Sequence, residues 1–317
     1  MEDVSEEIRK IARGLFEEDR VDLIIGFENG SLPLRATPCY IRSEEDTEKL
    51  IWHSGCENNL SVYIPKNKER IGIVAKGCDS RSLAGLLKER QIERENLVII
   101  GVPCHGMIDR KKIDEMLKGR YALSIEEKQG EIILKGRDFE EAARKIDLLP
   151  DSCLTCAHRN PVLYDFLVGD KVEENTEVDE FQKIKEIEAL PNDERWAYFT
   201  KETEKCIRCY ACRNACPLCY CAECCVDSSQ PQWFGKSTEP TDTQIFHIMR
   251  AFHTTGRCVD CGACVRVCPM DVDLRFLYKK IEKDVRELFS YEAGIDPEEP
   301  PPLATFKPDD PEGFIKR

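Results

Sequence analysis

The stretch "IGIVAKGCDSRSL", residues 71–83, begins with five apolar residues and continues, after Cys78, into a helical pattern. A second apolar run, "LVIIGV" at 97–102, follows that helix and is followed in turn by Cys104. A strand, a helix and a second strand in this order predict a βαβ unit with parallel strands. Because parallel neighbours end at the same edge of a sheet, we expect Cys78 and Cys104 to lie close together there.

Strand and helix patterns alternate through the first half of the chain, which predicts an α/β domain with a mostly parallel sheet. The further patterns there are strands at 21–27, 60–64 and 131–135 and helices at 4–16, 80–90, 108–118 and 138–146. The second half holds most of the cysteines and two apolar helical patterns, 243–252 and 274–289. We therefore expect it to be a mainly helical, ferredoxin-like domain.

The composition also suggests where the domains begin and end. The segment before the second half is acidic and helical in pattern, and the end of the chain is rich in proline. The predicted segments are an α/β iron–sulfur domain at 1–170, an acidic bridge at 171–203, a two-cluster ferredoxin domain at 204–290 and a Pro-rich tail at 291–317.

Charge and hydropathy exclude several classes of function. The 317 residues include 60 acidic and 46 basic side chains, for a net charge of −14. Such a balance argues against a nucleic-acid partner or an anionic membrane surface, both of which need clustered lysine and arginine. No apolar run is long enough to span a membrane, and the acidic start "MEDVSEEIRK" does not read as a signal peptide. We expect a cytoplasmic protein.

Cysteine is the residue type that stands out, with 18 in the chain. In a reducing compartment so many thiols do not form a disulfide framework, and their usual role is to bind metal. The five histidines complete none of the cysteine patterns described below, and no arrangement of catalytic residues is recognisable. The sequence therefore predicts metal-binding cysteines and no catalytic residue.

Two runs have the bacterial ferredoxin spacing. "CIRCYACRNACP" begins at Cys206 and "CVDCGACVRVCP" begins at Cys258. In this spacing three thiolates of one run bind one 4Fe–4S cluster, and the fourth cysteine binds the other cluster. A zinc ribbon is the alternative, but a four-cysteine run that ends in Cys-Pro does not fit it. The predicted ligand sets are Cys206, Cys209, Cys212 and Cys268 for one cluster, and Cys258, Cys261, Cys264 and Cys216 for the other.

A third site follows from the strand ends. "CLTCAHRN", starting at Cys153, adds Cys153 and Cys156 to the pair formed by Cys78 and Cys104. Together these four thiols equal the ligand count of a third 4Fe–4S cluster. The loop "KGCDSRS" also offers Lys76 and Arg81 near a helix N-terminus, where they would bind a pyrophosphate, be solvated or tune the cluster.

The four cysteines of this third site, with the "Gly-Asp" at 169–170, resemble the beta subunits of coenzyme F-420 (deazaflavin) hydrogenases and formate dehydrogenases. The resemblance covers roughly residues 20–170 and implies one 4Fe–4S cluster and a bound flavin, FAD. The long separation between the two ferredoxin runs resembles the helical ferredoxin domain of heterodisulfide reductases and succinate dehydrogenases. The chain as a whole thus resembles a heterodisulfide-reductase-associated iron–sulfur subunit.

Six cysteines remain outside these three sets. Four of them lie in "CPLCYCAECC", which is dense enough to hold most of a further cluster. The alternative is that they pack as small hydrophobic side chains or are spare thiols around the ferredoxin core. The predicted ligands of a fourth cluster are Cys56, Cys219, Cys221 and Cys224, which leaves Cys225 and Cys39 unassigned.

Taken together, these features predict an iron–sulfur electron-transfer subunit of an anaerobic oxidoreductase complex, with three or four 4Fe–4S clusters. The expected partners are other redox subunits, among them a heterodisulfide-reductase-like flavoprotein. The alternative function is an FAD-containing subunit that itself transfers hydride to or from deazaflavin or nicotinamide. Extractable flavin would distinguish the two functions, and a colourless, zinc-containing protein would exclude both.

Overall fold

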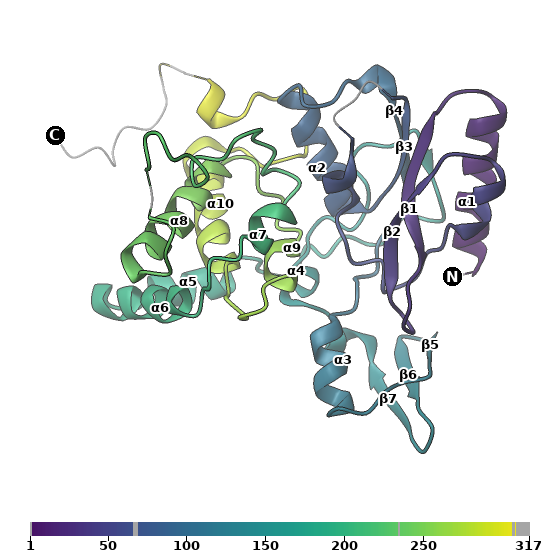
Figure 1. The fold of residues 1–317 in the computed structure, drawn as a ribbon, viewed down its shortest axis with the longest axis horizontal. Helices are drawn as coiled ribbons and strands as arrows, with labels where there is room; N and C mark the ends of the chain where they lie inside the picture. Colours follow the sequence, from purple (N-terminus) through teal and green to yellow (C-terminus); the bar gives the residue numbers. More distant parts are fainter. Residues whose placement is uncertain (1, 66–68, 234, 306–307, 309–317) are drawn as a thin grey trace. The chain divides into compact units, whose positions relative to one another are not determined.

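The computed structural model describes residues 2–65, 69–233, 235–305 and 308 of the chain (Figure 1). The described residues form two compact units. Unit 1 comprises Met1–Ser80 and Ile92–Val178, and unit 2 comprises Arg81–Gln91 and Asp179–Arg317. Helix α2, Gly77–Lys88, contributes its first turn to unit 1 and the rest to unit 2. The predicted tail at 291–317 lies partly outside the described residues.

Unit 1 is built on a five-stranded sheet with the order β2-β1-β3-β4-β8. Strand β1 pairs antiparallel with β2, and the remaining pairs are parallel, which confirms the predicted α/β class with a mostly parallel sheet. Helix α1 covers one face of this sheet (Figure 1). The bounds are α1 Glu2–Glu17, β1 Leu23–Asn29, β2 Ala36–Ile41, β3 Ile71–Ala75, β4 Leu97–Gly101 and β8 Phe166–Leu167.

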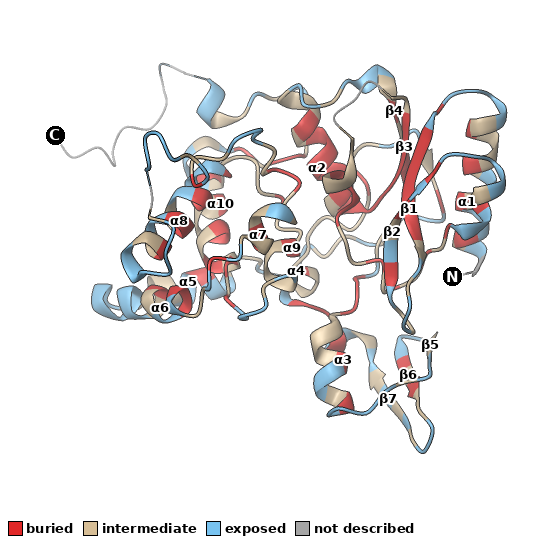
Figure 2. Cartoon of the chain, viewed as in Figure 1, coloured by how far each residue is buried: buried red, intermediate tan, exposed pale blue. Residues whose placement is uncertain are grey.

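The central strands are buried on both faces. Every residue of β3 is buried, and Ile73 and Ala75 have no exposed surface at all (Figure 2). Such a strand reads as a continuous apolar run rather than an alternating one, as expected for the middle of a parallel sheet covered on both sides. This explains why "IGIVA" and "LVIIG" carry the clearest strand signals in the sequence.

Unit 1 also contains a small antiparallel sheet, β5-β6-β7, at Ser124–Lys128, Glu131–Lys135 and Glu140–Arg144. Helix α3, Arg110–Leu117, packs its Ile113 and Leu117 against Ile132 and Leu134 of β6. A short helix α4, Asp151–Leu154, follows. This sheet supplies a satellite core of buried aliphatic side chains.

Two element predictions in unit 1 are wrong. Residues 138–146, expected to be helical, contain strand β7, whose Ala143 and Glu141 alternate with exposed neighbours and whose backbone pairs with β6. Pairing with a formed strand overrides the helix propensity of alanine and glutamate. Residues 60–64, expected to be a strand, contain a 3-10 helix, Leu60–Tyr63, because the Asn59 side chain accepts a hydrogen bond from the Ser61 N–H at its start.

Unit 2 is mainly helical, as predicted. Two long helices, α8 and α10, correspond to the apolar patterns at 243–252 and 274–289. Helices α7 and α9 are single turns that lie within the two ferredoxin runs. The bounds are α5 Gln182–Glu188, α6 Asn192–Glu204, α7 Ala211–Asn214, α8 Pro240–His253, α9 Ala263–Arg266 and α10 Arg275–Phe289.

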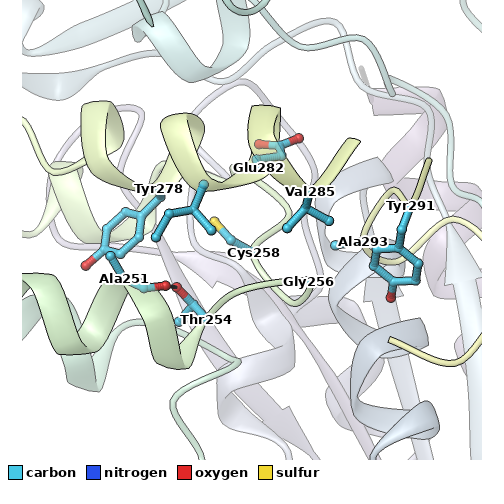
Figure 3. Close-up of a pocket in the computed structure, with 10 residues that line it drawn as sticks. Ala251, Thr254, Gly256, Cys258, Tyr278, Glu282, Val285, Tyr291 and Ala293 are labelled. Carbon is cyan, nitrogen blue, oxygen red and sulfur yellow. Dashed lines mark hydrogen bonds between the residues drawn. The ribbon is translucent and has the colours of Figure 1, made fainter. Parts of the chain in front are cut away.

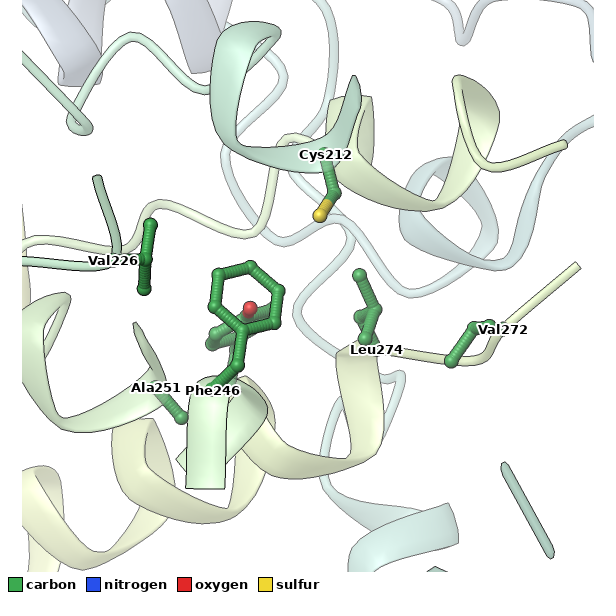
Figure 4. Close-up of a cluster of buried hydrophobic side chains, with 7 residues drawn as sticks. Cys212, Val226, Phe246, Ala251, Val272 and Leu274 are labelled. Atoms are coloured by element: carbon green, nitrogen blue, oxygen red, sulfur yellow. The ribbon is translucent and has the colours of Figure 1, made fainter. Parts of the chain in front are cut away.

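The core of unit 2 lies directly against its cysteines. Phe246 and Ala251 of α8 pack with Leu274 and Tyr278 at the start of α10, and Cys212 belongs to the same buried cluster (Figure 4). Several other cysteines of the two runs pack against this cluster while remaining partly exposed. The thiols therefore border an apolar region that keeps water away from one side of them.

In the described part of the chain, no helix is long and apolar enough to cross a membrane.

Candidate metal centres

The strand-end cysteines of unit 1 are placed in matching positions by the sheet. Strands β3 and β4 pair in parallel, with Ala75 opposite Gly101. Cys78 follows Ala75 by three residues and Cys104 follows Gly101 by three residues. The predicted βαβ unit is therefore confirmed, and the two thiols leave neighbouring strands at the same distance from their ends.

The Cys153–Cys156 segment is joined to both strand ends by backbone contacts. The Cys104 N–H donates a hydrogen bond of 2.9 Å to the Arg159 carbonyl. Gly77 lies so close to the same segment that an added Cβ would stand 2.3 Å from the His158 carbonyl oxygen. Only glycine fits there. Three separate stretches of unit 1 thus meet around residues 158–160, which brings their cysteines into one neighbourhood.

The thiols themselves also interact. Burial, together with the neighbouring Cys153 and Cys156, raises the pKa of Cys104 to about 12, whereas Lys76 acts to lower it. Thiols that affect one another in this way lie near each other in a region of low dielectric constant. A thiol with a raised pKa still loses its proton when it binds a metal, because only the thiolate is a ligand.

Lys76 is a buried cation beside this site. Its Nζ donates to Asp79 Oδ2 at 2.9 Å and to the carbonyls of Asn58 and Cys56 at 2.8 and 3.1 Å. Burial acts to lower the pKa of Lys76, but Asp79 and Cys78 outweigh it, so that the pKa is raised and the ammonium remains charged. Lys76 is 2% exposed and is therefore not solvated.

Arg81 is likewise engaged internally. Its guanidinium donates to the Ala293 carbonyl at 2.8 and 3.1 Å, within unit 2. Because both cations of "KGCDSRS" have internal partners, neither is placed to bind a pyrophosphate. Of the roles considered from the sequence, one agrees with the buried position of Lys76. In that role its charge would tune a cluster bound by the neighbouring cysteines.

The two ferredoxin runs of unit 2 have the same backbone conformation. In the first run Arg208 and Tyr210 have positive φ angles of 52° and 61°. In the second, Asp260 and Gly262 occupy the equivalent positions, with φ of 52° and 70°. A single helical turn, α7 or α9, follows in each case. Left-handed residues are uncommon, so a repeated pair at the same spacing indicates two copies of one cysteine-presenting loop.

The thiols of the first set influence one another across the two runs. The pKa of Cys206 is raised by burial and by Cys268 and Cys209. The pKa of Cys212 is raised by burial and also by Cys206 and Cys268. Cys268 comes from the second run, so the fourth cysteine of that run lies near thiols of the first run.

The second set shows the same relationship. Burial and the nearby Cys261 together raise the pKa of Cys264 to about 12, although Arg250 acts to lower it. Cys261 also raises the pKa of Cys216, which belongs to the first run. The pKa of Cys258 is raised by burial, by Glu282 and Asp260 and, to a smaller extent, by Cys264. The structure therefore brings together members of both predicted sets.

The equivalent residues Arg208 and Asp260 give the two loops opposite charges. Arg208 donates to the Ser237 carbonyl at 3.1 Å and to the Tyr210 hydroxyl at 2.9 Å. Asp260 accepts two hydrogen bonds of 2.7 Å from Arg275 on α10. Each loop is thus fixed to its surroundings by a different kind of side chain.

Sequence reasoning missed Arg250, which lies on α8 and is 6% exposed. Its guanidinium donates to the Cys212 carbonyl at 2.9 Å and to the Tyr278 hydroxyl. Its charge acts to lower the pKa values of Cys212, Cys216 and Cys264, which belong to both ligand sets. The signal in the sequence was a lone arginine within the apolar pattern "TQIFHIMRAF".

Cys258 lies beside a cavity of about 10 Å³ in unit 2 (Figure 3). Ala251 and Thr254 at the end of α8 line one side of it, and Tyr278 and Val285 of α10 line another. A space of this size is at the lower limit for one water molecule. The second loop is therefore tightly packed on the side of Cys258.

In the described ranges, no three His, Cys, Asp or Glu side chains converge closely enough to hold one metal ion.

The four cysteines predicted to bind a fourth cluster do not all belong to the same unit. Cys219, Cys221 and Cys224 line a cavity of unit 2, together with Cys225. Cys56 is fully buried in unit 1, where burial raises its pKa to about 12. Cys56 is thus not among the residues that line this cavity, whereas Cys225 is. Cys39 lies on β2 and is 8% exposed.

Residues 252–272, which include the whole of the second run, match the family "Fer4: 4Fe-4S binding domain". An α/β unit and a cysteine-rich helical unit with this match define the class of protein. The chain is an iron–sulfur electron-transfer subunit of an oxidoreductase.

The chain is homologous to the beta subunits of F420-dependent formate dehydrogenases, which confirms the resemblance seen in the sequence. It is 25% identical to the F420-dependent formate dehydrogenase subunit beta of Methanocaldococcus jannaschii, over 90% of this chain and 91% of the relative. It is also 25% identical to the F420-dependent formate dehydrogenase 1 subunit beta of Methanococcus maripaludis, over 91% of this chain and 90% of that one.

Among solved structures, the chain matches one from the F420-reducing [NiFe] hydrogenase complex of Methanosarcina barkeri. The TM-score is 0.37 at 15% sequence identity, and the match covers 49% of this chain and 63% of that chain.

Proposed function

We propose that the chain relays electrons between other redox subunits through three 4Fe–4S clusters, one in unit 1 and two in unit 2. The observation that carries the proposal is the repeated loop conformation at Arg208 and Tyr210 and at Asp260 and Gly262. Two such loops, each with three cysteines and each near the fourth cysteine of the other run, are what a pair of clusters requires.

The proposed ligands in unit 2 are the two crosswise sets. Cys206, Cys209, Cys212 and Cys268 would hold one cluster, and Cys258, Cys261, Cys264 and Cys216 the other. Arg250 supports this assignment, because a buried cation next to thiols of both sets offsets the negative charge that two neighbouring clusters bring. It would also make both clusters easier to reduce.

The proposed ligands in unit 1 are Cys78, Cys104, Cys153 and Cys156. The register of β3 and β4, the contact at Gly77 and the hydrogen bond to Arg159 support this set. Lys76 would hold a fixed positive charge beside the cluster, and Asp79 would keep that charge in place. The Asp79 carboxylate also accepts from the Leu60 and Lys76 N–H groups, so it is itself fixed.

A second candidate function is hydride transfer at a bound FAD, to or from a deazaflavin or nicotinamide. It is favoured by the words "F420-dependent" in the names of both relatives. The residues named above account for electron transfer and for none of the flavin contacts, so the relay is the leading proposal. A partner flavoprotein of the heterodisulfide-reductase type would then carry out the two-electron step.

Metal analysis of the anaerobically purified chain tests the relay. The three proposed sets account for about twelve irons and about twelve acid-labile sulfides, at four of each per cluster. The Cys39→Ala variant is the control, because Cys39 belongs to none of the sets and should keep the full content. A chain with eight irons or fewer would contradict the cluster in unit 1, and a chain with zinc in place of iron would contradict the whole proposal.

Turnover separates the two candidate functions. The isolated chain should accept electrons from dithionite or reduced ferredoxin and should show no deazaflavin or nicotinamide oxidation, with or without added FAD. Stoichiometric flavin in an acid extract, together with turnover by the chain alone, would make it the flavoenzyme instead.

A further inference from the structure

The segment Leu218–Asp227 and helix α8 enclose a cavity of about 220 Å³ in unit 2. It lies within one compact unit, so its shape does not depend on how the two units are placed. Phe246 and Val226 give it an apolar wall, and four cysteines and three arginines also line it. No residue of the three proposed cluster sets lines this cavity. Its cysteines therefore need an explanation of their own.

The four cysteines all come from one short loop, "CYCAECC" at 219–225. Cys221 is exposed, and Cys219, Cys224 and Cys225 are partly exposed, so none is sealed within the core. Burial raises the pKa of Cys225, and the neighbouring Cys224 and Cys221 act in the same direction, so these three thiols lie near one another. Thiols that only filled space would be expected to lie in the core, as Cys56 does.

The cations that line the cavity are Arg213, Arg250 and Arg257. Arg213 forms an ion pair of 2.7 Å with Asp227, and Arg257 forms one of 2.5 Å with Glu89. Arg250 is 6% exposed and has no carboxylate partner among its hydrogen bonds to Tyr278 and Cys212. Its Nε is buried and has no hydrogen-bond partner. Because Arg250 lines the cavity, this donor is free to bond an acceptor bound there.

We infer that this cavity binds a fourth 4Fe–4S cluster, with Cys219, Cys221, Cys224 and Cys225 as its four ligands. Soft thiolates select iron–sulfur clusters or zinc. A single zinc ion would leave most of 220 Å³ empty, whereas a cluster fills space and presents sulfide atoms as acceptors. The unpartnered Arg250 Nε–H matches such an acceptor, and the three arginines match the negative charge of a cluster bound by four thiolates.

A cluster at this site would add a further step to the proposed electron relay. Its role in electron transfer therefore rests on that proposed function. The Cys219 N–H donates a hydrogen bond of 3.1 Å to the carbonyl of Cys216, a proposed ligand of the cluster on the second loop, and the Cys219 thiol raises the pKa of Cys216. A cluster in the cavity would therefore be adjacent to that cluster. Since Cys221 is exposed, as Cys209 of the first set is, the new cluster would also have a ligand at the surface, where electrons can enter or leave.

The test is metal and spin analysis of the whole chain with Cys221→Ala and Cys224→Ala combined. The parent chain should contain about sixteen irons and the double variant about twelve, with one spin fewer per chain after full reduction by dithionite. Each single variant of the four cysteines should lose the same cluster. Met249→Leu, which changes another residue lining the cavity without removing a thiol, should keep all sixteen irons.

Two controls keep the outcomes separate. Circular dichroism and the reduced ferredoxin signals of the double variant should match the parent, which excludes unfolding as the cause of iron loss. A parent with about twelve irons, and variants that lose none, would overturn the fourth cluster and leave the three-cluster relay intact. One equivalent of zinc that disappears in the double variant would also overturn it. A parent without iron would contradict the proposed relay itself.

Discussion

The cysteines of unit 2 and those of unit 1 are brought together in different ways. In unit 2 three thiols of each run lie within seven residues, on a loop whose left-handed residues recur at the same positions in both runs. In unit 1 the four thiols come from three stretches that meet only in the folded sheet. The first kind of site depends on local backbone geometry, and the second depends on strand register and on close contacts such as that of Gly77.

The surroundings of the two sites differ as well. Unit 1 buries a charged lysine and gives it a carboxylate partner, Asp79. Unit 2 buries Arg250 against a carbonyl and a hydroxyl and, three residues earlier on α8, buries His247 with neither ring nitrogen hydrogen-bonded. Substitution and pH change the free energy of unfolding differently in these two cases, one a buried charge that has a partner and the other a buried neutral group that has none. The predictions that follow use these differences.

The largest expected effect comes from pairs of substitutions within unit 2. If the runs exchange their fourth cysteines, Cys268→Ala and Cys206→Ala remove the same cluster. Their combination should cost about four irons, whereas Cys268→Ala with Cys261→Ala should cost about eight. Iron analysis with electron paramagnetic resonance measures both. If instead Cys268→Ala with Cys261→Ala cost only four irons, each run would hold its own cluster.

The unit 1 site should lose one cluster on a single substitution. Cys78→Ala should remove about four irons, and adding Cys104→Ala should remove no more, because both thiols serve one cluster. The ferredoxin signals of unit 2 should persist in both variants. A full iron content in Cys78→Ala would show that the strand ends do not form a metal site.

Removing one partner of the buried pair in unit 1 should destabilise that unit. Lys76→Met leaves the Asp79 carboxylate buried without a counter-charge, at a cost of about 3–5 kcal/mol in the free energy of unfolding. Denaturant unfolding measures this cost. Lys76→Met combined with Asp79→Asn should recover part of it, since no uncompensated charge remains. Equal stabilities for the single and double variants would mean that the pair is not held as a charged pair.

A smaller, pH-dependent effect is expected from His247 in unit 2. Burial, with smaller contributions from Arg250 and Arg208, lowers its pKa from 6.5 to about 4. The unfolded chain therefore binds a proton below pH 6.5 that the folded chain does not bind until about pH 4. The stability that the neutral ring contributes is fully present above pH 6.5 and is lost as the pH falls towards 4, by about 3 kcal/mol in all.

His247→Leu should thus make the unfolding of unit 2 less sensitive to acid between pH 7 and pH 5. His253→Gln, a change at an exposed position at the end of the same helix, should leave the acid sensitivity as it is. Thermal unfolding under anaerobic conditions at both pH values is the measurement. An unchanged pH dependence in His247→Leu would show that another group is responsible.

The ferredoxin runs and the βαβ unit could be predicted because their signals are local. Spacing alone identifies cysteines that share a loop, and an apolar run bounded by a helix identifies a buried parallel strand. The helix expected at 138–146 was wrong for the opposite reason. The backbone of Glu140–Arg144 pairs with β6, and that pairing, which no local pattern in these residues reveals, outweighs their helix propensity.

By itself, the sequence determined the class of fold, the number of cysteines and the two runs that present them, because each of these depends on neighbours along the chain. Only the tertiary structure decided that Gly77 touches residues 158–160, that Arg250 lies among thiols of both runs, and that Cys225 rather than Cys56 lines the cavity with Cys219. These are contacts between residues far apart in sequence. They are fixed by strand register and helix packing, which no short stretch of the sequence encodes.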